Sequence, residues 1–410
     1  MHIKKTILLS LFISVPLCYA LISISKSQVP QWNIVLEKNW EEVFNRKDGW
    51  TGADVARSVD LRDGRTLWLF GDTWIGKVLD NRHAPGSQMV NNSLGLLPTP
   101  SPGSGKAPSP DLAKFYWGSN NSEGKPTAWI LPDSTRVPAH RDDDAEGWAV
   151  YWLTGDGLLT HYKSGSDRLV LFAAHVGKAK SENPVWGFKS VGGAILIVEN
   201  PHDPIKQWRI QQYDNPQVME TDRAKKDPNL YEISWGTAAH YDPNGFIYIY
   251  GVKETRPSKN ILLARAPSSS VETFDTWQFR TKDGWSHRLK DAVSIASRAA
   301  NEFSVNRVQH KGKELLIMVQ SEEAFGRNIQ IRTAKNWEGP WSEPVFIYEV
   351  PNIRPKEFAY AAKGHYHLSS RGRLLISYIV NSHDFWSMAA NADIYHPRFI
   401  SIDLQPLFSK

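Results

Sequence analysis

Residues 54–71 read Asp54-Val-Ala-Arg-Ser-Val-Asp60, a turn at Arg62-Asp63-Gly64, and Thr66-Leu-Trp-Leu-Phe-Gly71. Small and β-branched residues precede the turn, and large apolar residues follow it. This order predicts the two strands of a β-hairpin, because such side chains pack well on a pleated surface. Asp and Gly suit the turn, since they tolerate its backbone angles or hydrogen-bond to it.

The same plan recurs four more times along the chain. The further hairpins are 158–162 with 168–172, 235–241 with 246–250, 303–309 with 314–319, and 362–368 with 373–378. The turns between their strands are 164–166, 242–245, 311–313 and 370–372. Self-similarity at an interval of this size is typical of repeat architectures.

A third strand, and usually a fourth, follows the later hairpins. These strands are predicted at 261–265, 277–280, 329–332, 345–348 and 397–403. Four antiparallel strands in each of five units predict an all-β five-bladed β-propeller. One or two β-sandwiches are the alternative, but a regular four-strand repeat does not favour them.

The composition fits one large β domain. The chain has 410 residues, 41% hydrophobic and 22% charged, with 17 Trp, 28 Gly and 25 Pro. No helix longer than a turn or two is required, and 284–300 is the segment that could form a short one. The Pro-, Ser- and Gly-rich stretch 99–112 is expected to be a surface loop. We therefore predict a single domain over residues 31–410.

The N-terminus has the features of an export signal. Lys4 and Lys5 precede a mostly apolar run from Ile7 to Ile24, and cleavage is expected after Ala20. We predict a signal peptide at residues 1–20 and a secreted or periplasmic protein; an uncleaved anchor reaching about residue 26 is the alternative. The only cysteine, Cys18, lies in this segment, so the mature domain has no disulfide and no thiolate site.

Charge argues against a nucleic-acid partner. The chain carries 48 Lys and Arg against 43 Asp and Glu. Without Lys4 and Lys5 the balance is 46 to 43, a net charge of +3. No basic run with interleaved aromatics accompanies this small excess. We expect a monomer that meets no membrane beyond its N-terminal segment.

Several motifs resemble a bacterial propeller family. They are Trp50-Thr-Gly-Ala-Asp54, Phe70-Gly-Asp-Thr73, Glu302-Phe-Ser-Val, Arg332-Thr-Ala, Glu338-Gly-Pro-Trp341-Ser and Ala361-Ala-Lys-Gly-His365 with Ser377-Tyr378. The family was long described as a domain of unknown function, and some members are endo-D-arabinanases (glycoside hydrolase family 183). The resemblance runs from about Trp40 to the C-terminus. It implies a five-bladed fold and a furanoside or related glycan as substrate.

Three acids are candidates for catalysis. Glycoside hydrolysis needs one protonated carboxyl group to release the leaving oxygen and one ionised carboxylate to activate water or attack. Asp54 and Glu302 stand at the starts of predicted inner strands, and these starts converge in a propeller. Asp72 follows a strand of large apolar residues. For Asp54 a turn cap is the structural alternative, for Glu302 a solvated rim position, and for Asp72 an Asx turn.

Seven further residues are predicted to contact substrate, although a packing or ion-pair role is the alternative for each. They are Arg57, Trp152, Asp156, Trp235, Arg307, Lys363 and His365. His365 and His367 face one side of a strand with no further ligand nearby, so no zinc site is predicted. No cofactor is predicted either, and nothing in the sequence indicates an axial Ca²⁺.

The leading hypothesis is an exported glycoside hydrolase acting on a furanoside-containing polysaccharide, with a D-arabinan-like substrate favoured. A non-catalytic carbohydrate-binding propeller is the alternative, because a fold hosts many functions. A lyase using Lys363, His365 or a tyrosine as base is a third reading.

Overall fold

The computed structural model describes residues 32–133, 145–179, 188–218, 233–255, 258–323 and 325–409. The predicted signal peptide at residues 1–20 lies outside these ranges. Within them, no helix has the length and apolar character needed to cross a membrane. Residues 32–410 form one compact unit. The unit is built from antiparallel sheets, which confirms the all-β prediction.

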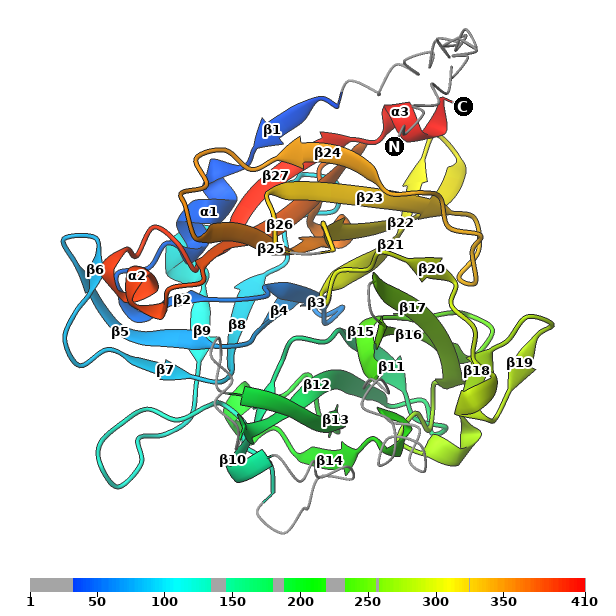
Figure 1. Cartoon of the computed structure of the whole chain (residues 1–410), viewed down its shortest axis with the longest axis horizontal. Helices are drawn as coiled ribbons and strands as arrows, with labels where there is room; N and C mark the ends of the chain where they lie inside the picture. The colour runs from blue at the N-terminus through cyan, green and yellow to red at the C-terminus, as the bar shows by residue number, and fades with distance from the viewer. Residues whose placement is uncertain are drawn as a thin grey trace, which may run out of the picture. The chain divides into compact units, whose positions relative to one another are not determined.

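Five sheets follow one another along the chain, as the colours of Figure 1 show. Sheet 1 contains β3 (Arg57–Asp60), β4 (Arg65–Phe70), β8 (Ser93–Pro98) and β9 (Lys114–Tyr116). Sheet 2 contains β10 (Ala145–Trp152), β11 (Gly157–His161), β12 (Asp167–Ala179), β13 (Phe188–Val198) and β14 (Ile210–Asp214). Sheet 3 contains β15 (Ile233–Tyr241), β16 (Phe246–Thr255), β17 (Ser258–Pro267), β18 (Gln278–Arg280), β19 (Trp285–Ser286) and β20 (Ala296–Ser297).

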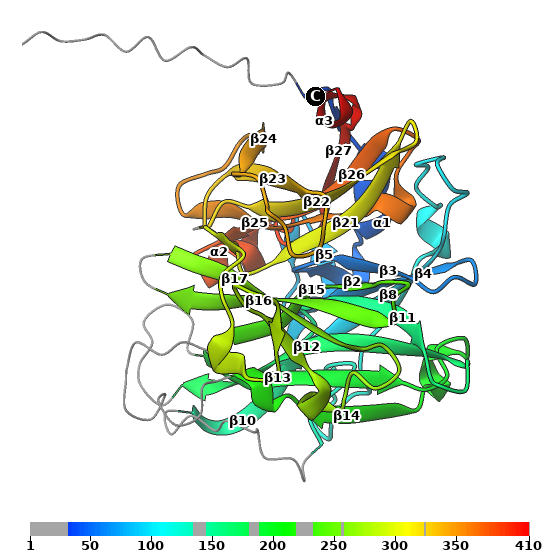
Figure 2. The same cartoon turned by 90° about the vertical axis from the view of Figure 1, so that its right-hand side faces the viewer.

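The remaining sheets complete the strand inventory of the described residues. Sheet 4 contains β21 (Phe303–His310), β22 (Lys313–Ser321), β23 (Asn328–Ala334) and β24 (Val345–Glu349). Sheet 5 contains β25 (Glu357–Gly364), β26 (Arg373–Ser382), β27 (Arg398–Asp403) and the early strand β1 (Ile34–Leu36). A smaller sheet contains β2 (Asp48–Ala53), β5 (Thr73–Leu79), β6 (Arg82–His83) and β7 (Gln88–Val90). Figure 2, turned by 90°, keeps β25–β27 above β12–β14 as in Figure 1.

The second strand of each sheet is buried on both faces, so its side chains alternate between two cores. In β4, Leu67 and Leu69 enter the core shared with sheet 2, whereas Trp68 and Phe70 enter the core shared with sheet 5. Similar cores lie between sheets 2 and 3, 3 and 4, and 4 and 5. Each sheet therefore packs against its two neighbours, and sheet 5 packs against sheet 1.

The N-terminal described segment joins the last sheet to the first. Strand β1 pairs with β27, with Ile34 opposite Ile402. Helix α1 (Lys38–Phe44) follows, and its Phe44 ring stacks on Phe399 at 5.5 Å and meets Trp68 edge-on at 4.8 Å. The segment thus fixes the contact between sheets 5 and 1.

The helical elements are short. They are α1, α2 (Phe385–Ala390), α3 (Gln405–Phe408), and the 3₁₀ turns η1 (Pro110–Leu112), η2 (Ile205–Gln207), η3 (Pro216–Val218), η4 (Phe274–Thr276), η5 (Leu289–Asp291) and η6 (Tyr366–Leu368). The segment 284–300, predicted as the place for a short helix, contains only η5 between two short strands.

Two predicted strand boundaries are wrong. The inner strand of sheet 5 was expected at 362–368, but β25 ends at Gly364 and η6 follows. The inner strand of sheet 1 was expected to begin at Asp54, but β3 begins at Arg57. Val55 and Ala56 have positive φ angles of 75° and 55°, which break the strand. Asp54 therefore lies on the connection between β2 and β3.

Candidate functional site

Reciprocal backbone hydrogen bonds hold Asp54 beside the end of β4. The Asp54 N–H donates to the Asp72 carbonyl at 3.1 Å, and the Gly71 N–H donates to the Asp54 carbonyl at 3.3 Å. The next residue, Val55, is buried with φ at 75°, a conformation that is costly for a β-branched side chain. Such strain is concentrated at functional sites, where the surrounding structure enforces it.

The Asp54 carboxyl group is enclosed, although the residue keeps a partly exposed surface. A Cβ atom at Gly71 would lie 2.3 Å from its Oδ1 atom, so glycine leaves the space that this oxygen occupies. Oδ1 is buried with no hydrogen-bond partner among the described residues. The other oxygen, Oδ2, accepts a hydrogen bond from the Tyr360 hydroxyl group at 3.2 Å.

Burial raises the pKa of Asp54 well above its usual range, and the negative charges of Asp72 and Glu302 raise it further. The hydroxyl groups of Tyr360 and Tyr395 oppose this rise. A carboxyl group that is both desolvated and close to other carboxylates retains its proton. Asp54 therefore keeps its proton to higher pH than an ordinary aspartic acid does.

Asp72 lies at the bend between β4 and β5. Burial raises its pKa to about 7, while the Asn91 amide and the Trp152 indole N–H counteract part of that rise. The Asn91 side chain donates to Oδ1 of Asp72 at 3.2 Å. Asp72 therefore titrates close to neutrality beside Asp54.

Glu302 directly precedes β21 and is partly exposed. Burial raises its pKa, but the positive charges of Lys363 and Lys259 favour the ionised form. Because Glu302 also raises the pKa of Asp54, the three carboxyl groups form one electrostatic cluster. We call Asp54, Asp72 and Glu302 the acid cluster.

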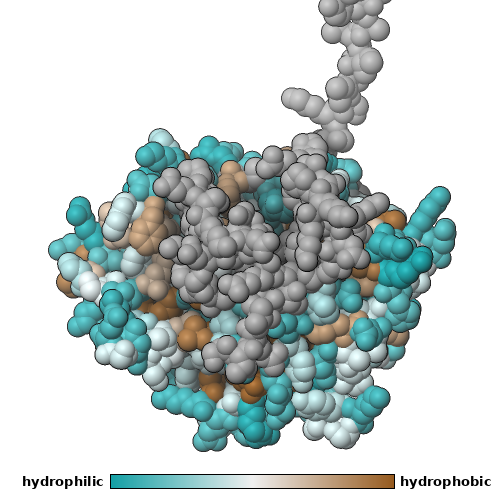
Figure 3. Space-filling view, turned by 60° about the horizontal axis from the view of Figure 1, so that its bottom comes forward, coloured by the Kyte–Doolittle hydropathy of each residue, from teal (hydrophilic) through white to brown (hydrophobic). Residues whose placement is uncertain are grey.

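A cavity of about 250 Å³ adjoins the acid cluster at Glu302. Trp152 and Trp235 line it, and Gly155, Gly192 and Gly193 leave room between them. The Trp235 indole N–H donates to the Gln217 carbonyl at 2.8 Å, which fixes the ring. Trp152 and Trp235, two of the predicted substrate contacts, thus lie beside a predicted catalytic acid. Figure 3 shows one face of the molecule, where hydrophilic and hydrophobic residues alternate around the atoms drawn in grey.

Four other predicted substrate contacts are engaged within the protein. Arg57 Nε lies 2.5 Å from Oδ1 of Asp156, which is fully buried, and the other Asp156 oxygen accepts the Ala239 N–H at 2.8 Å. Lys363 is fully buried and donates to the Phe303 carbonyl at 3.3 Å. His365 is held between Ser58 at 2.6 Å and Ser377 at 2.8 Å. These groups link strands of neighbouring sheets, and their contact with substrate stays a prediction.

Arg307 lies apart from the acid cluster. Its Nη2 atom is 2.9 Å from Oδ2 of Asp242, in the turn after β15, and its guanidinium group lies 4.7 Å from the centre of the Trp337 ring. Asp242 and Trp235 are at opposite ends of β15. The structure therefore does not bring Arg307 to the cavity, although a role in binding stays a prediction.

Tyr360, Tyr395 and Asn91 were not predicted as part of the site. The side chain of each contacts an acid of the cluster, but no motif or pattern around these residues indicated a role in the site. In the part of the chain that the structure describes, no group of three or more His, Cys, Asp or Glu residues is arranged to hold a metal ion. The site offers proton donors and acceptors beside an aromatic cavity.

A family model described as "Domain of unknown function (DUF5005)" matches residues 37–404. No curated protein matches the sequence. A structure from Bacteroides ovatus, described as a presumed hydrolase, has a TM-score of 0.68 at 18% identity and covers 92% of each chain. It shows the same fold.

Other similar structures include glycoside hydrolases. An α-L-arabinofuranosidase from Podospora anserina has a TM-score of 0.43 at 10% identity, covering 87% of this chain and 91% of its own. An endo-arabinase from Bacteroides thetaiotaomicron has a TM-score of 0.40 at 12% identity, covering 87% and 97%. These scores are too low to support a functional argument.

Proposed function

Since the chain belongs to the DUF5005 family, whose description states no activity, we propose its function from its site: a glycoside hydrolase that uses the acid cluster. One observation carries the proposal. Burial and the charges of Asp72 and Glu302 raise the pKa of Asp54 well above its usual range, so Asp54 keeps its proton to higher pH than an ordinary carboxyl group does. Pairs of acids whose environments separate their pKa values are the mark of acid–base chemistry.

In the proposed mechanism, Asp54 protonates the glycosidic oxygen as the bond from that oxygen to the anomeric carbon breaks. Glu302, whose charge Lys363 and Lys259 favour, either attacks the anomeric carbon or takes a proton from the attacking water. The water oxygen ends on the anomeric carbon with one of its protons, as the new hydroxyl group. Its other proton restores Asp54, directly if Glu302 is the nucleophile, or from Glu302 by exchange with solvent if Glu302 is the base. Asp72 keeps Asp54 protonated through its charge and orients the acid cluster through Asn91.

We propose a neutral sugar as substrate. Among the described residues that line the cavity, Glu254 and Glu302 are acidic and none is Lys or Arg. A uronic acid would meet like charge there, which costs binding energy. The resemblance of the Phe70–Thr73 and Trp50–Asp54 motifs favours a furanoside, with D-arabinan first.

We propose further that the five sheets form a five-bladed β-propeller and that the protein is exported. The hydrophobic cores support the first proposal. Four of them lie between consecutive sheets, and the fifth lies between sheets 5 and 1. The basic and apolar N-terminal run supports the second. Fractionation of the native host, with N-terminal sequencing of the mature protein, tests export; a cytosolic protein starting at Met1 contradicts it.

The test is hydrolysis of polysaccharides by the domain that follows Ala20. D-arabinan, L-arabinan, arabinoxylan and galactan are incubated with wild type and with Asp54→Asn, Glu302→Gln and Asp283→Asn. Released oligosaccharides should fall about 10²–10⁴-fold in the first two variants, since each removes acid–base catalysis. Asp283 lies exposed in a turn, so its variant is the matched control.

A carbohydrate-binding propeller is the second candidate, because the cavity between Trp152 and Trp235 would hold a sugar whether or not it is cleaved. Binding of one polysaccharide without release of products from any of them would establish this alternative. Products that are unchanged in Asp54→Asn would reject the assigned acid.

A further inference from the structure

A connected group of aromatic side chains leads from the surface to Asp54. Phe325 is 49% exposed, and its ring centre lies 4.4 Å from that of Phe358. Phe358 is 5.4 Å from Tyr360, whose hydroxyl group donates to Asp54. His383, an exposed residue, has its ring 4.6 Å from Phe358 and 5.6 Å from Phe325. We call Phe325, Phe358 and His383 the aromatic platform.

The backbone holds Phe325 at the surface. The neighbouring Gly326 bridges to Ala359 of β25, and the Ala359 N–H donates to the Gly326 carbonyl at 2.7 Å. Glu322 accepts the Arg327 N–H at 2.9 Å and so closes the loop. A Cβ atom at Gly326 would overlap the Glu322 carboxylate, so the glycine leaves room for this side chain to reach the Arg327 N–H. A large apolar ring is therefore kept half exposed by a loop that is fixed on both sides.

The platform combines an apolar surface with polar ring nitrogens. Phe325 presents an aromatic face, and the His383 imidazole lies at its edge with an interplanar angle of 78°. A sugar ring has the matching chemistry, because one face carries C–H groups and its rim carries hydroxyl groups. Exposed apolar patches rimmed by polar groups mark binding sites, and aromatic side chains supply contact area with few torsions to order.

The platform and the cavity approach Asp54 from different sides. Oδ2 of Asp54 faces Tyr360 and the platform. Oδ1 faces Gly71, and a Cβ atom there would lie 3.5 Å from Thr154, which lines the cavity. Figures 1 and 2 show β25, which carries Phe358 and Tyr360, above β12 and β13, which carry residues that line the cavity. One glycan chain can thus cross the acid cluster with sugars on both sides.

We propose that the aromatic platform binds sugar units of the substrate on the side of the acid cluster opposite the cavity. This inference rests on the proposed hydrolase function, because that function makes the acid cluster the point at which the glycan chain is cleaved. Phe325 supplies the stacking face, and His383 hydrogen-bonds to a hydroxyl group of the bound sugar. The platform then makes the protein favour long chains over short ones.

The experiment compares Phe325→Ala, wild type and Phe346→Ala. Phe346, on the outer strand β24, is 56% exposed and serves as the matched control. D-arabinan and its oligosaccharides of two to eight units are the hydrolysis probes. Loss of the stacking contact should lower kcat/KM for the longest chains about three- to tenfold in Phe325→Ala and leave the shortest cleaved substrate unchanged. Equal losses for all lengths, or no loss, would overturn the proposal.

A binding assay separates the platform from the hydrolase. Asp54→Asn proteins with and without Phe325→Ala run in native gels containing D-arabinan, L-arabinan, arabinoxylan or galactan. If a polysaccharide retards the protein and Phe325→Ala weakens this retardation, the platform proposal is supported. If wild type nevertheless hydrolyses nothing, only the hydrolase proposal fails. If wild type hydrolyses a polysaccharide and Phe325→Ala leaves the retardation unchanged, the platform proposal is rejected and the hydrolase proposal stands. No retardation in any gel also overturns the platform.

Discussion

The hydroxyl group of Tyr360 donates a hydrogen bond to Oδ2 of Asp54 at 3.2 Å, although 306 positions separate the two residues in the chain. Asn381 of β26 donates to the same hydroxyl oxygen at 3.3 Å, which directs its proton toward Asp54. Two residues of sheet 5 therefore position the carboxyl group of Asp54, which lies on the connection between β2 and β3. This contact is where the fifth and first sheets meet at the site.

The Tyr360→Phe variant should shift the pH dependence of hydrolysis. The Tyr360 hydroxyl group lowers the pKa of Asp54, so its removal raises that pKa further. A general acid works only while protonated, and activity falls as pH rises through its pKa. The alkaline limb of the kcat/KM profile should therefore move to higher pH in this variant.

The matched control is Tyr378→Phe. Tyr378 is buried in β26 and its ring lies 6.0 Å from Tyr348, away from Asp54, so it loses the same atom without changing the acid cluster. Its alkaline limb should stay at the wild-type pH. An acid limb that moves to higher pH in Tyr360→Phe, with the alkaline limb unchanged, would show that Asp54 acts as a base, and the assigned roles would be wrong.

The Gly71→Ala variant should reduce activity far more than stability. Its Cβ atom would lie 2.3 Å from Oδ1 of Asp54, so the carboxyl group must move. A displacement of about 1 Å at a reacting group costs about 10²-fold in rate. Gly165→Ala is the control, because it has open space but φ at 90°. Gly165→Ala should lower the Tm and leave kcat/KM unchanged. If Gly71→Ala also lowers the Tm and leaves kcat/KM unchanged, the position of the Asp54 carboxyl group does not matter for catalysis.

Local sequence signals were sufficient for the hairpins. Leu67-Trp68-Leu69-Phe70 is apolar on both faces because β4 lies between two cores, and Gly64 with φ at 85° closes the turn before it. Each hairpin needs only side-chain period and turn chemistry, both of which are local. The predicted strand start at Asp54 was three residues too early, whereas Glu302 directly precedes β21 as expected.

The contacts of the site with β25 could not be predicted in this way. The register of β25 shifts between Tyr360 and Lys363, where Ala361 has φ at 52°. A bulge changes which face each later side chain occupies. Lys363 and His365, which follow the bulge, are therefore buried for a reason that the residue types in 357–368 do not indicate. The contact of Tyr360 with Asp54 depends instead on how sheet 5 packs against sheet 1.

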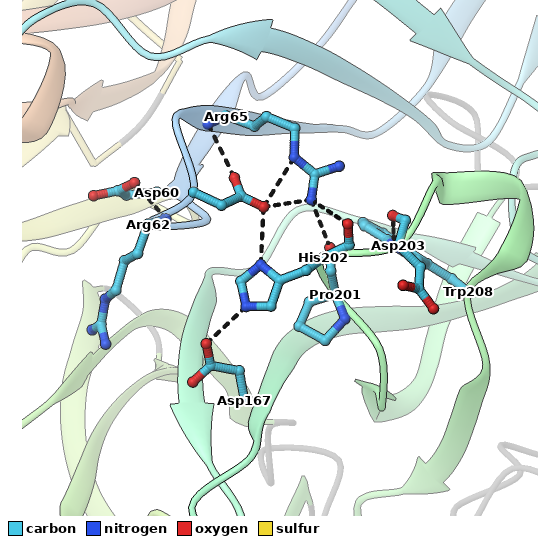
Figure 4. Close-up of polar contacts among 9 residues, drawn as sticks. Asp60, Arg62, Arg65, Asp167, Pro201, His202, Asp203 and Trp208 are labelled. Carbon is cyan, nitrogen blue, oxygen red and sulfur yellow. Dashed lines mark hydrogen bonds and ion pairs between the residues drawn. The ribbon is translucent and has the colours of Figure 1, made fainter.

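His202 links the turns of sheets 1 and 2, and Figure 4 shows the contacts. Its Nδ1 lies 2.9 Å from Oδ2 of Asp63, and its Nε2 lies 2.7 Å from Oδ2 of Asp167. Arg65 donates to the His202 carbonyl at 2.9 Å, and His161 Nδ1 lies 2.6 Å from Oδ1 of Asp167. Two carboxylates thus flank the imidazole, and Arg65 and His161 contact the same two carboxylates.

This link should make stability depend on pH. Hydrogen bonds from His202 to Asp63 and Asp167 raise the pKa of His202, so its contribution is fully present below its unfolded pKa of about 6.5 and is lost as pH rises through the raised folded value. Partial burial alone would raise the pKa values of Asp63 and Asp167, but their partners hold both below the usual range. Their contribution is present above about pH 4 and is lost as pH falls through the lowered values.

The His202→Gln variant should therefore lose the most stability between about pH 4 and 6.5, and progressively less as pH rises through the raised pKa of His202. The side chain is 42% exposed, so solvent screening limits the loss to under about 1 kcal/mol, or about 1–2 °C in Tm. Thermal unfolding of wild type, His202→Gln and His287→Gln from pH 4 to 9 measures it, with His287 of sheet 3 as the control histidine. A Tm difference between wild type and His202→Gln that does not change with pH would show that the imidazole acts by packing alone.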